Sequence, residues 1–416
     1  MNLPSASMLE DFPALTWRDV APHLSDPVRH TLEEVLATGD GSKISRDDLC
    51  QLVHTEGADL AGVLVAANLL RLKLAGDTVT YVMNRNINFT NICFIACKFC
   101  AFCCGPNSPE AYQLSAEQVA EKAMEAAELG ATEVCVQGGI AHSLSQFYYR
   151  DTLRAIKKAV PAMHTHAFSP MEILYGASRA GMPIREYLLM LQDAGLDTMP
   201  GTAAEILNDD VRAVTAKNKL TTEQWREVIT TAHQCKIPTT STIMYGHCER
   251  AEHWVDQLLL IRNIQRETGG FTEFVPLGFI HQNTRLFQQG LSRPGASKRE
   301  HLLIHALGRI ALAGAVNNVQ VSWVKLTREV AQLCLQAGAN DYGGTLMEEN
   351  ISRLAGVESA QYLSPEEFAV RIRELGRVPA QRDTVYKILR FAQDDGGEPR
   401  TSFLIKENVH GKGAMA

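Results

Sequence analysis

The chain has neither a long apolar run nor an excess of positive charge. Its longest candidate for an apolar run, residues 61–70, is followed by Arg71 and Lys73 and is far shorter than the roughly 20 apolar residues that a membrane helix needs. The net charge of −7 at pH 7 gives no electrostatic reason to expect nucleic acid as a partner. We therefore expect neither a membrane protein nor a nucleic-acid-binding protein.

The first residues also lack the basic start and apolar core of a signal peptide. The sequence contains ten cysteines, three of them within eight residues. Clustered thiols in a chain of this length indicate a reducing compartment and a metal site rather than disulfides. We therefore expect a cytoplasmic protein that holds a metal centre.

The clustered cysteines are Cys93, Cys97 and Cys100, with the spacing Cys-x-x-x-Cys-x-x-Cys. Three nearby thiolates can bind one soft metal centre. If they bind a 4Fe–4S cluster, one iron has no protein ligand and can bind a small molecule, whereas structural zinc and iron–sulfur sites normally have four protein ligands. Redox cysteines are an alternative, and so is a zinc site that uses Cys103 and Cys104 in place of Cys93.

From Val79 onward, short β-rich runs alternate with amphipathic helical stretches. The predicted strands are Val79–Asn88, Thr132–Gln137, His164–Phe168, Asp197–Pro200, Pro238–Met244, Thr272–Leu277, Val319–Val324 and Asp341–Leu346. Eight strands that alternate with helices predict an α/β fold, a parallel (βα)8 TIM-type barrel. An open doubly wound sheet and a six-unit partial barrel with two extra units are the alternatives.

We expect three regions along the chain. Residues 1–76 should form a lead-in and a helical cap, because Ser45 and Asp48 have the spacing of a capping box and apolar residues from Leu60 to Leu74 recur at helical spacing. Residues 77–392 should form the barrel. Residues 393–416 are polar and glycine-rich and should form a tail.

Polar and glycine-rich segments follow the predicted strands or form their ends. After the cysteines of the first strand, these segments are Gln137-Gly138-Gly139, His166–Pro170, Pro200–Glu205, Thr239–Glu249, Glu273 with His281, Ser322–Lys325 and Asn340–Thr345. In (βα)8 barrels the catalytic groups come from the carboxyl ends of the strands and the loops after them. The sequence therefore predicts a single site at that rim.

The cysteine spacing resembles that of the radical S-adenosylmethionine (radical SAM) superfamily, whose reduced 4Fe–4S cluster cleaves SAM to methionine and a 5′-deoxyadenosyl radical. The resemblance implies that Cys93, Cys97 and Cys100 bind the cluster and that SAM is the second cofactor. The further residues that it assigns to SAM are Gln137, Gly138, Gly139, Glu205, Gly246, Glu249 and Trp323, although Trp323 could instead be a core residue.

Longer segments resemble the CofH family over about residues 45–390. They are Asn88–Asn91, Gln137–Ile140, His166–Pro170, Pro200–Glu205, Thr239–His247, Val321–Lys325 and Gly343–Glu349. The resemblance implies transfer of the 4-hydroxybenzyl group of L-tyrosine to 5-amino-6-(D-ribitylamino)uracil, with release of 2-iminoacetate, in deazaflavin biosynthesis. A CofG-like second enzyme on a separate chain and a flavodoxin or ferredoxin that reduces the cluster are the implied partners. Residues 103–107 depart from the family, which usually has an arginine-containing stretch there.

His166, His247 and Glu273 are the candidate catalytic residues. Each has a structural alternative, because a buried histidine can simply be hydrogen-bonded and a buried carboxylate is costly unless it is paired. Two other functions stay open. One is that of another radical SAM enzyme: a futalosine-pathway enzyme similar to MqnC or MqnE, against which the segment Pro200–Glu205 argues, or a tyrosine lyase with no uracil acceptor. The other is that of a non-catalytic iron–sulfur or zinc protein.

The cluster assignment makes a direct prediction. Cys97→Ala should abolish 5′-deoxyadenosine production, because the cluster would lose one of its three ligands, while circular dichroism should show a folded protein. Continued 5′-deoxyadenosine production by this variant, measured by mass spectrometry, would exclude the assignment.

Overall fold

A computed structural model describes residues 8–357 and 362–391. The predicted tail over residues 393–416 lies outside them. The strands are β1 (Thr78–Val82), β2 (Asn84–Asn88), β3 (Glu133–Gln137), β4 (His164–Ala167), β5 (Thr239–Tyr245), β6 (Phe271–Gly278), β7 (Asp341–Gly344), β8 (Val378–Arg382) and β9 (Ile388–Phe391).

The α-helices are α1 (Met8–Asp11), α2 (Trp17–Val20), α3 (Asp26–Thr38), α4 (Arg46–Val53), α5 (Gly57–Ala75), α6 (Ala116–Glu128), α7 (Tyr148–Ala159), α8 (Pro170–Ala180), α9 (Ile184–Asp193), α10 (Asp209–Thr215), α11 (Thr222–Gln234), α12 (Ala251–Thr268), α13 (Arg285–Gln288), α14 (Lys298–Ala311), α15 (Arg328–Gln336), α16 (Asn350–Ala355) and α17 (Pro365–Arg373). Short 3-10 helices are η1 (Phe12–Ala14), η2 (Ala21–His23), η3 (Gly41–Lys43) and η4 (Trp323–Lys325).

Parallel strands form a ring at the centre of the molecule. Strands β2, β3 and β4 pair in that order, β5 pairs with β6, and β7 pairs with β1. Single β-bridges join these groups: His166 to Thr198, Met199 to Thr239, Phe274 to Val319, and Gln320 to Asp341. The predicted (βα)8 barrel is thus confirmed.

Several predicted strand boundaries are wrong. The strand expected over Val79–Asn88 is two strands, because Met83 separates β1, which pairs with β7 and β8, from β2, which pairs with β3. Two expected strands, 197–200 and 319–324, are reduced to single bridges. Pro200 has no N–H to donate to a ladder, and the chain turns into η4 at Trp323.

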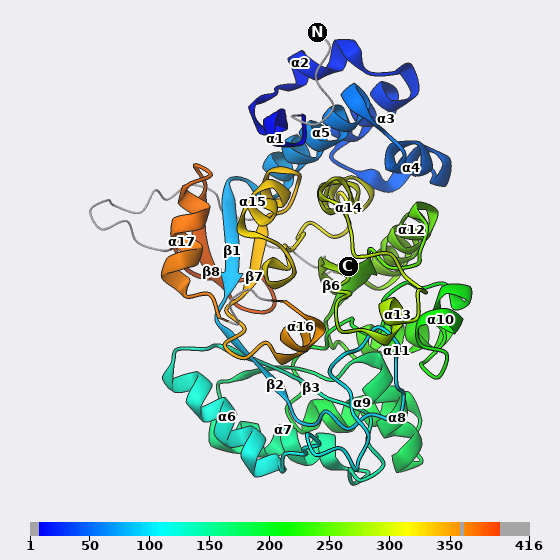
Figure 1. Ribbon diagram of the computed structural model, residues 1–416. Helices are drawn as coiled ribbons and strands as arrows, with labels where there is room; N and C mark the ends of the chain where they lie inside the picture. Colours follow the sequence, from blue (N-terminus) through cyan, green and yellow to red (C-terminus); the bar gives the residue numbers. More distant parts are fainter. Residues whose placement is uncertain (1–7, 358–361, 392–416) are drawn as a thin grey trace, which may run out of the picture.

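The helices cover the outside of the ring and the cap packs on one end. The valines of β3, Val134 and Val136, share a buried cluster with residues of α6 and α7. A second buried cluster runs from the cap helices into α12 and α14, and the cap lies at one end of the molecule, in blue in Figure 1. Ser45 and Asp48 form the predicted capping box of α4. Within the described ranges, no helix is long and apolar enough to cross a membrane.

The hairpin of β8 and β9, which the sequence did not reveal, brings polar side chains to the amino-terminal end of the barrel. Arg382 makes a bidentate ion pair with Asp341, with Nε–Oδ2 and Nη2–Oδ1 distances of 2.5 and 3.0 Å, and its guanidinium lies 4.0 Å from the centroid of the Tyr386 ring. The Tyr386 hydroxyl donates to Glu273 Oε2 at 2.5 Å, and Thr384 donates to Glu133. This end of the barrel is therefore filled by a buried, paired network.

The network predicts that two arginines contribute very different amounts to the free energy of unfolding. Arg382→Met should lower the free energy of unfolding by about 3–5 kcal/mol, because Asp341 would stay buried without its cation. Arg328→Met is the control, since its pair with Glu374 is exposed and should contribute less than about 1 kcal/mol. Urea unfolding followed by circular dichroism measures both, and equal effects would contradict the network's role in stability.

Candidate active site

The loop between β2 and α6 carries the three cysteines, and neighbouring elements hold it by backbone contacts. Phe94 N donates to Ile140 O at 3.0 Å and Lys98 N to Thr215 O at 2.8 Å. On the opposite side Arg285 Nη2 donates to Ala96 O at 2.7 Å. The loop is therefore fixed to the carboxyl end of β3, to α10 and to α13.

The thiols lie in apolar surroundings. Cys97 is buried, while Cys93 and Cys100 are half-buried and pack against the same small cluster with Ile95 and Ile140. Burial raises the pKa of the Cys97 thiol to about 12, whereas a hydrogen bond from the Cys103 thiol, the largest cause, lowers the pKa of Cys100 to about 6. Cys103 itself has a raised pKa, chiefly through that bond, so it is the protonated partner.

The donor set fits a 4Fe–4S cluster. Within residues 8–357 and 362–391, no three His, Cys, Asp or Glu side chains already stand in metal-binding positions. The cysteines nevertheless come from one anchored loop with an apolar lining, and Lys219 Nζ lies 5.2 Å from the centroid of the Phe99 ring within it. A nearby cation favours the thiolate form that binds metal.

Gly138 and Gly139 meet the cysteine loop directly. A Cβ at Gly139 would lie 2.1 Å from the carbonyl oxygen of Ile92, and one at Gly138 would lie 2.5 Å from the Phe89 ring. The two glycines are therefore needed for the loop to pack on β3, and their predicted contact with SAM stays a prediction. Gly138 N also donates to Glu172 Oε1 at 3.0 Å.

Two other predicted SAM residues lie at the carboxyl ends of the strands. The half-buried Gln137 ends β3, and its Oε1 accepts from the Thr202 hydroxyl at 3.4 Å. Glu205 follows the fourth strand position and pairs with Lys219 at 2.7 Å and with Arg212 at 3.6 Å. Because Lys219 also faces Phe99, the Glu205–Lys219 pair stands beside the cysteine loop.

The predicted residues after β5 form hydrogen bonds with other residues of the protein. The Glu249 carboxylate is fully enclosed and accepts from the amides of Gly246 and His247 at 2.7 and 2.8 Å, from Trp254 Nε1 at 3.1 Å and from Arg293 Nη2 at 2.9 Å. His247 Nε2 bonds Met244 O at 3.0 Å. These bonds stabilise the loop, and the predicted roles of Gly246 and Glu249 in SAM binding and of His247 in catalysis stay untested.

Trp323 belongs to the hydrophobic core. Its Nε1 donates to Gly344 O at 2.9 Å, and its ring packs edge-on against Phe368 of α17 at 6.3 Å. The core alternative that the sequence left open describes this position, and stacking on adenine stays untested.

The two other catalytic candidates face the barrel interior. His166 Nδ1 bonds the Thr198 hydroxyl at 2.8 Å, and burial lowers its pKa to about 4, so the imidazole is neutral at pH 7. Glu273 is the third residue of β6 and lies below the rim, where it accepts from Gln320 Nε2 at 2.8 Å and from Tyr386. The sequence left rim and core both open for Glu273, and the core position describes it, because β6 continues to Gly278. Neither catalytic role is tested.

The barrel interior is not densely filled at its middle. Cys135 lies at the centre of β3, level with Asn86 and His166 on the neighbouring strands, and yet it is only half-buried. The sequence predicted an ordinary buried cysteine there. Lys325 and Glu349, which lie near the carboxyl ends of the last two strand positions, are further interior polar residues that the sequence analysis did not single out.

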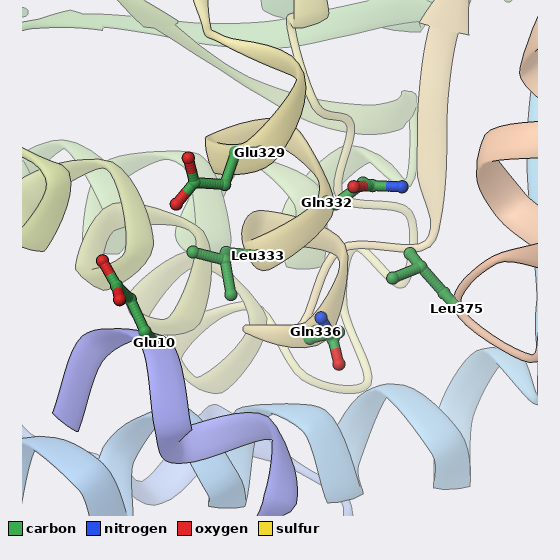
Figure 2. A pocket seen from close by; sticks show the side chains of 6 residues that line it. All are labelled: Glu10, Glu329, Gln332, Leu333, Gln336 and Leu375. Atoms are coloured by element: carbon green, nitrogen blue, oxygen red, sulfur yellow. The ribbon is translucent and has the colours of Figure 1, made fainter. Parts of the chain in front are cut away.

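A surface pocket of about 240 Å³ lies elsewhere. Figure 2 shows its lining side chains, which come from α1, from α15 and from the segment after α17: Glu10, Glu329, Gln332, Leu333, Gln336 and Leu375. None of them follows the carboxyl end of a barrel strand, so this pocket is not the candidate active site.

Comparison with known proteins identifies the family of this chain. Residues 87–260 match the radical SAM superfamily, and residues 268–394 match the CofH/MqnC C-terminal region. The 5-amino-6-(D-ribitylamino)uracil–L-tyrosine 4-hydroxyphenyl transferase of Methanothermobacter thermautotrophicus is 46% identical over 360 residues, which cover 86% of this chain and 98% of that protein. The chain belongs to the CofH family of radical SAM enzymes. Its cofactors are accordingly a 4Fe–4S cluster and SAM.

Other relatives extend the comparison. The FO synthase of Mycobacterium leprae is 50% identical over 352 residues, or 85% of this chain, and the chain spans about two-fifths of its length, 41%. The solved structure of the methylornithine synthase PylB matches with a TM-score of 0.64 at 17% identity, over 84% of this chain and 97% of that one. The hydrogenase maturase HydG matches with a TM-score of 0.67 at 14% identity, over 91% and 79%. These two structures support the fold.

The contact at Gly139 predicts a specific loss. Gly139→Ala should force the cysteine loop away from β3, at a cost of about 1–3 kcal/mol, and lower the iron and sulfide content after reconstitution. Gly105→Ala in the same loop is the control, since a Cβ there meets nothing within 4 Å. Equal iron content in the two variants would contradict the proposed role of this contact.

Proposed function

We propose that the chain joins the 4-hydroxybenzyl group of L-tyrosine to carbon 5 of 5-amino-6-(D-ribitylamino)uracil and releases 2-iminoacetate, a step in deazaflavin biosynthesis. The main support is the near full-length similarity to enzymes that bear the name of this transferase, at 46–49% identity. The three-cysteine loop at the rim of a partly hollow barrel supplies the chemical setting that such a reaction needs.

Different residues of the chain would have separate roles in this reaction. Cys93, Cys97 and Cys100 would hold the cluster, and Gln137 and Glu205 would lie on the SAM side of the rim. When bound, the two cofactors supply a 5′-deoxyadenosyl radical that takes a hydrogen atom from tyrosine. The half-open interior around Cys135 leaves room for the substrates, and the filled amino-terminal end of the barrel limits access of water from below.

The proposed partners follow from the same chemistry. The cluster must be reduced, so a flavodoxin or ferredoxin would donate the electron. A CofG-like enzyme would close the deazaflavin ring on the released product. A cytoplasmic location would provide the reducing conditions that a thiolate-bound cluster requires.

Anaerobic turnover tests the proposal. The reconstituted protein, with SAM, dithionite, tyrosine and the diaminouracil, should produce both 5′-deoxyadenosine and the hydroxybenzyl adduct, and each should depend on tyrosine. Mass spectrometry detects both products, and a reaction without the diaminouracil is the control.

Other outcomes would assign the chain elsewhere. 5′-Deoxyadenosine without the adduct would keep the radical chemistry but contradict this substrate pair, and would assign the chain the reaction of a relative, such as a tyrosine lyase with no uracil acceptor. Zinc without acid-labile sulfide in the isolated protein would contradict the radical reaction itself.

A further inference from the structure

Lys325 and Glu349 occupy the part of the rim that the cluster and SAM residues leave free. Lys325 ends η4, directly after the seventh strand position, and Glu349 precedes α16, after β7. These two strand positions are neighbours, because Gln320 bridges to Asp341. Apart from Trp323, whose ring packs in the core, the residues assigned to the cofactors come from the first five strand positions, so this side of the rim remains for a substrate.

The Glu349 carboxylate is directed toward the barrel interior. Its Oε2 accepts from Asn86 Nδ2 at 2.7 Å, and its Oε1 accepts from Ser352 N at 2.8 Å. Asn86 faces inward on β2, because the alternate residues Arg85 and Ile87 contact the outer helices. Figure 1 shows α16 between β7 and the strands β2 and β3, in agreement with the Asn86 contact.

Lys325 is a cation with spare hydrogen-bonding capacity. Its Nζ donates to the Ser352 hydroxyl at 2.7 Å. Among residues 8–357 and 362–391, this is the one hydrogen bond of the Lys325 ammonium, and no carboxylate lies within ion-pair distance of that group. An ammonium has three N–H donors, so two are unused on a half-buried side chain. Burial lowers the pKa of Lys325, while the charge of Glu349 opposes that shift.

Ser352 brings the two charges together. Its amide contacts Glu349 and its hydroxyl contacts Lys325, so an ammonium and a carboxylate flank one residue without neutralising each other in an ion pair. A partly desolvated cation in this state is costly unless an anion compensates it. The arrangement is complementary to a zwitterionic α-amino acid, which carries a carboxylate and an ammonium on the same carbon atom.

We propose that Lys325 and Glu349 form the subsite for the head group of the α-amino acid substrate. Lys325 binds the α-carboxylate and Glu349 binds the α-ammonium. This inference rests on the proposed function, in which tyrosine is the amino acid. The uracil substrate carries no carboxylate, so its carbonyl and hydroxyl groups can accept hydrogen bonds from Lys325 but do not compensate its charge. The anchored fragment is then the one that leaves as 2-iminoacetate, and the phenol ring is the part that moves.

Equilibrium binding tests the subsite without turnover. The reconstituted holoenzyme is titrated calorimetrically with L-tyrosine and with tyramine, which lacks the carboxylate, in the presence of SAM and without a reductant. Lys325→Met should weaken tyrosine binding about 10- to 100-fold, as expected for loss of a charge-assisted hydrogen bond. Tyramine binding should change by less than about threefold, and Lys325→Arg should keep part of the preference for tyrosine.

Glu349 is tested with the complementary ligand. Glu349→Gln should weaken binding of tyrosine but not of 3-(4-hydroxyphenyl)propionate, which lacks the amine. Lys122→Met is the matched control, since Lys122 pairs with the adjacent Glu348 on the outer side of the barrel at 3.0 Å and should leave the tyrosine-to-tyramine ratio unchanged. Cluster absorbance and the melting temperature identify any variant that fails to fold.

Two results would overturn the subsite: equal binding of tyrosine and tyramine by the wild type, or a Lys325→Met variant that keeps the wild-type preference. The adduct assay separates this inference from the proposed function. A wild type that forms the adduct while Lys325→Met keeps its preference leaves the function intact and removes the subsite. A wild type that binds tyrosine through Lys325 but forms no adduct supports the subsite and contradicts the proposed reaction.

Discussion

The close approach of the cysteine loop to the carboxyl end of β3 is the constraint on which the rest of the site depends. The Ile92 carbonyl occupies the place where a side chain at residue 139 would begin. Gly139 N donates to Thr90 O at 2.8 Å, which fixes the height of the loop above the barrel. The same loop carries the three thiols, meets Lys219 through the Phe99 ring and contacts α13 through Arg285.

The two ends of the barrel are chemically different. At the amino-terminal end each charge has a partner, as in the Arg382–Asp341 pair and in the bonds to Glu273. At the carboxyl end Glu205 and Glu249 are also paired, but the Lys325 ammonium has a hydroxyl as its hydrogen-bond partner and no carboxylate within ion-pair distance among the described residues. Since buried charges are tolerated when they are paired, the lower end serves stability, while the upper end retains binding capacity for ligands.

The sequence predicted features that are local and missed those that are distant. The cysteine spacing and the alternation of strands and helices are local, so the fold was predicted correctly, and the assignment of the cluster to the three cysteines stays a prediction. The break at Met83 has no turn residue to mark it. The strand β8 lacks the apolar pattern of a buried strand, because its buried side chains include the polar Gln381 and Arg382. Nothing near Lys325 indicates that Ser352 will face it, and nothing near Glu249 indicates that Arg293, 44 positions further along the chain, will pair with it.

The hairpin of β8 and β9 also bears on how the protein is made. Thr384 donates a hydrogen bond to Glu133, which lies 251 positions earlier in the sequence. The buried carboxylate of Asp341 likewise depends on Arg382 for its ion pair. During synthesis on the ribosome the ring of strands therefore emerges with its acidic lower end still hydrated and uncompensated. Long-range contacts of this kind form late and slowly. The barrel consequently cannot reach its native packing until the segment around residue 384 has left the exit tunnel.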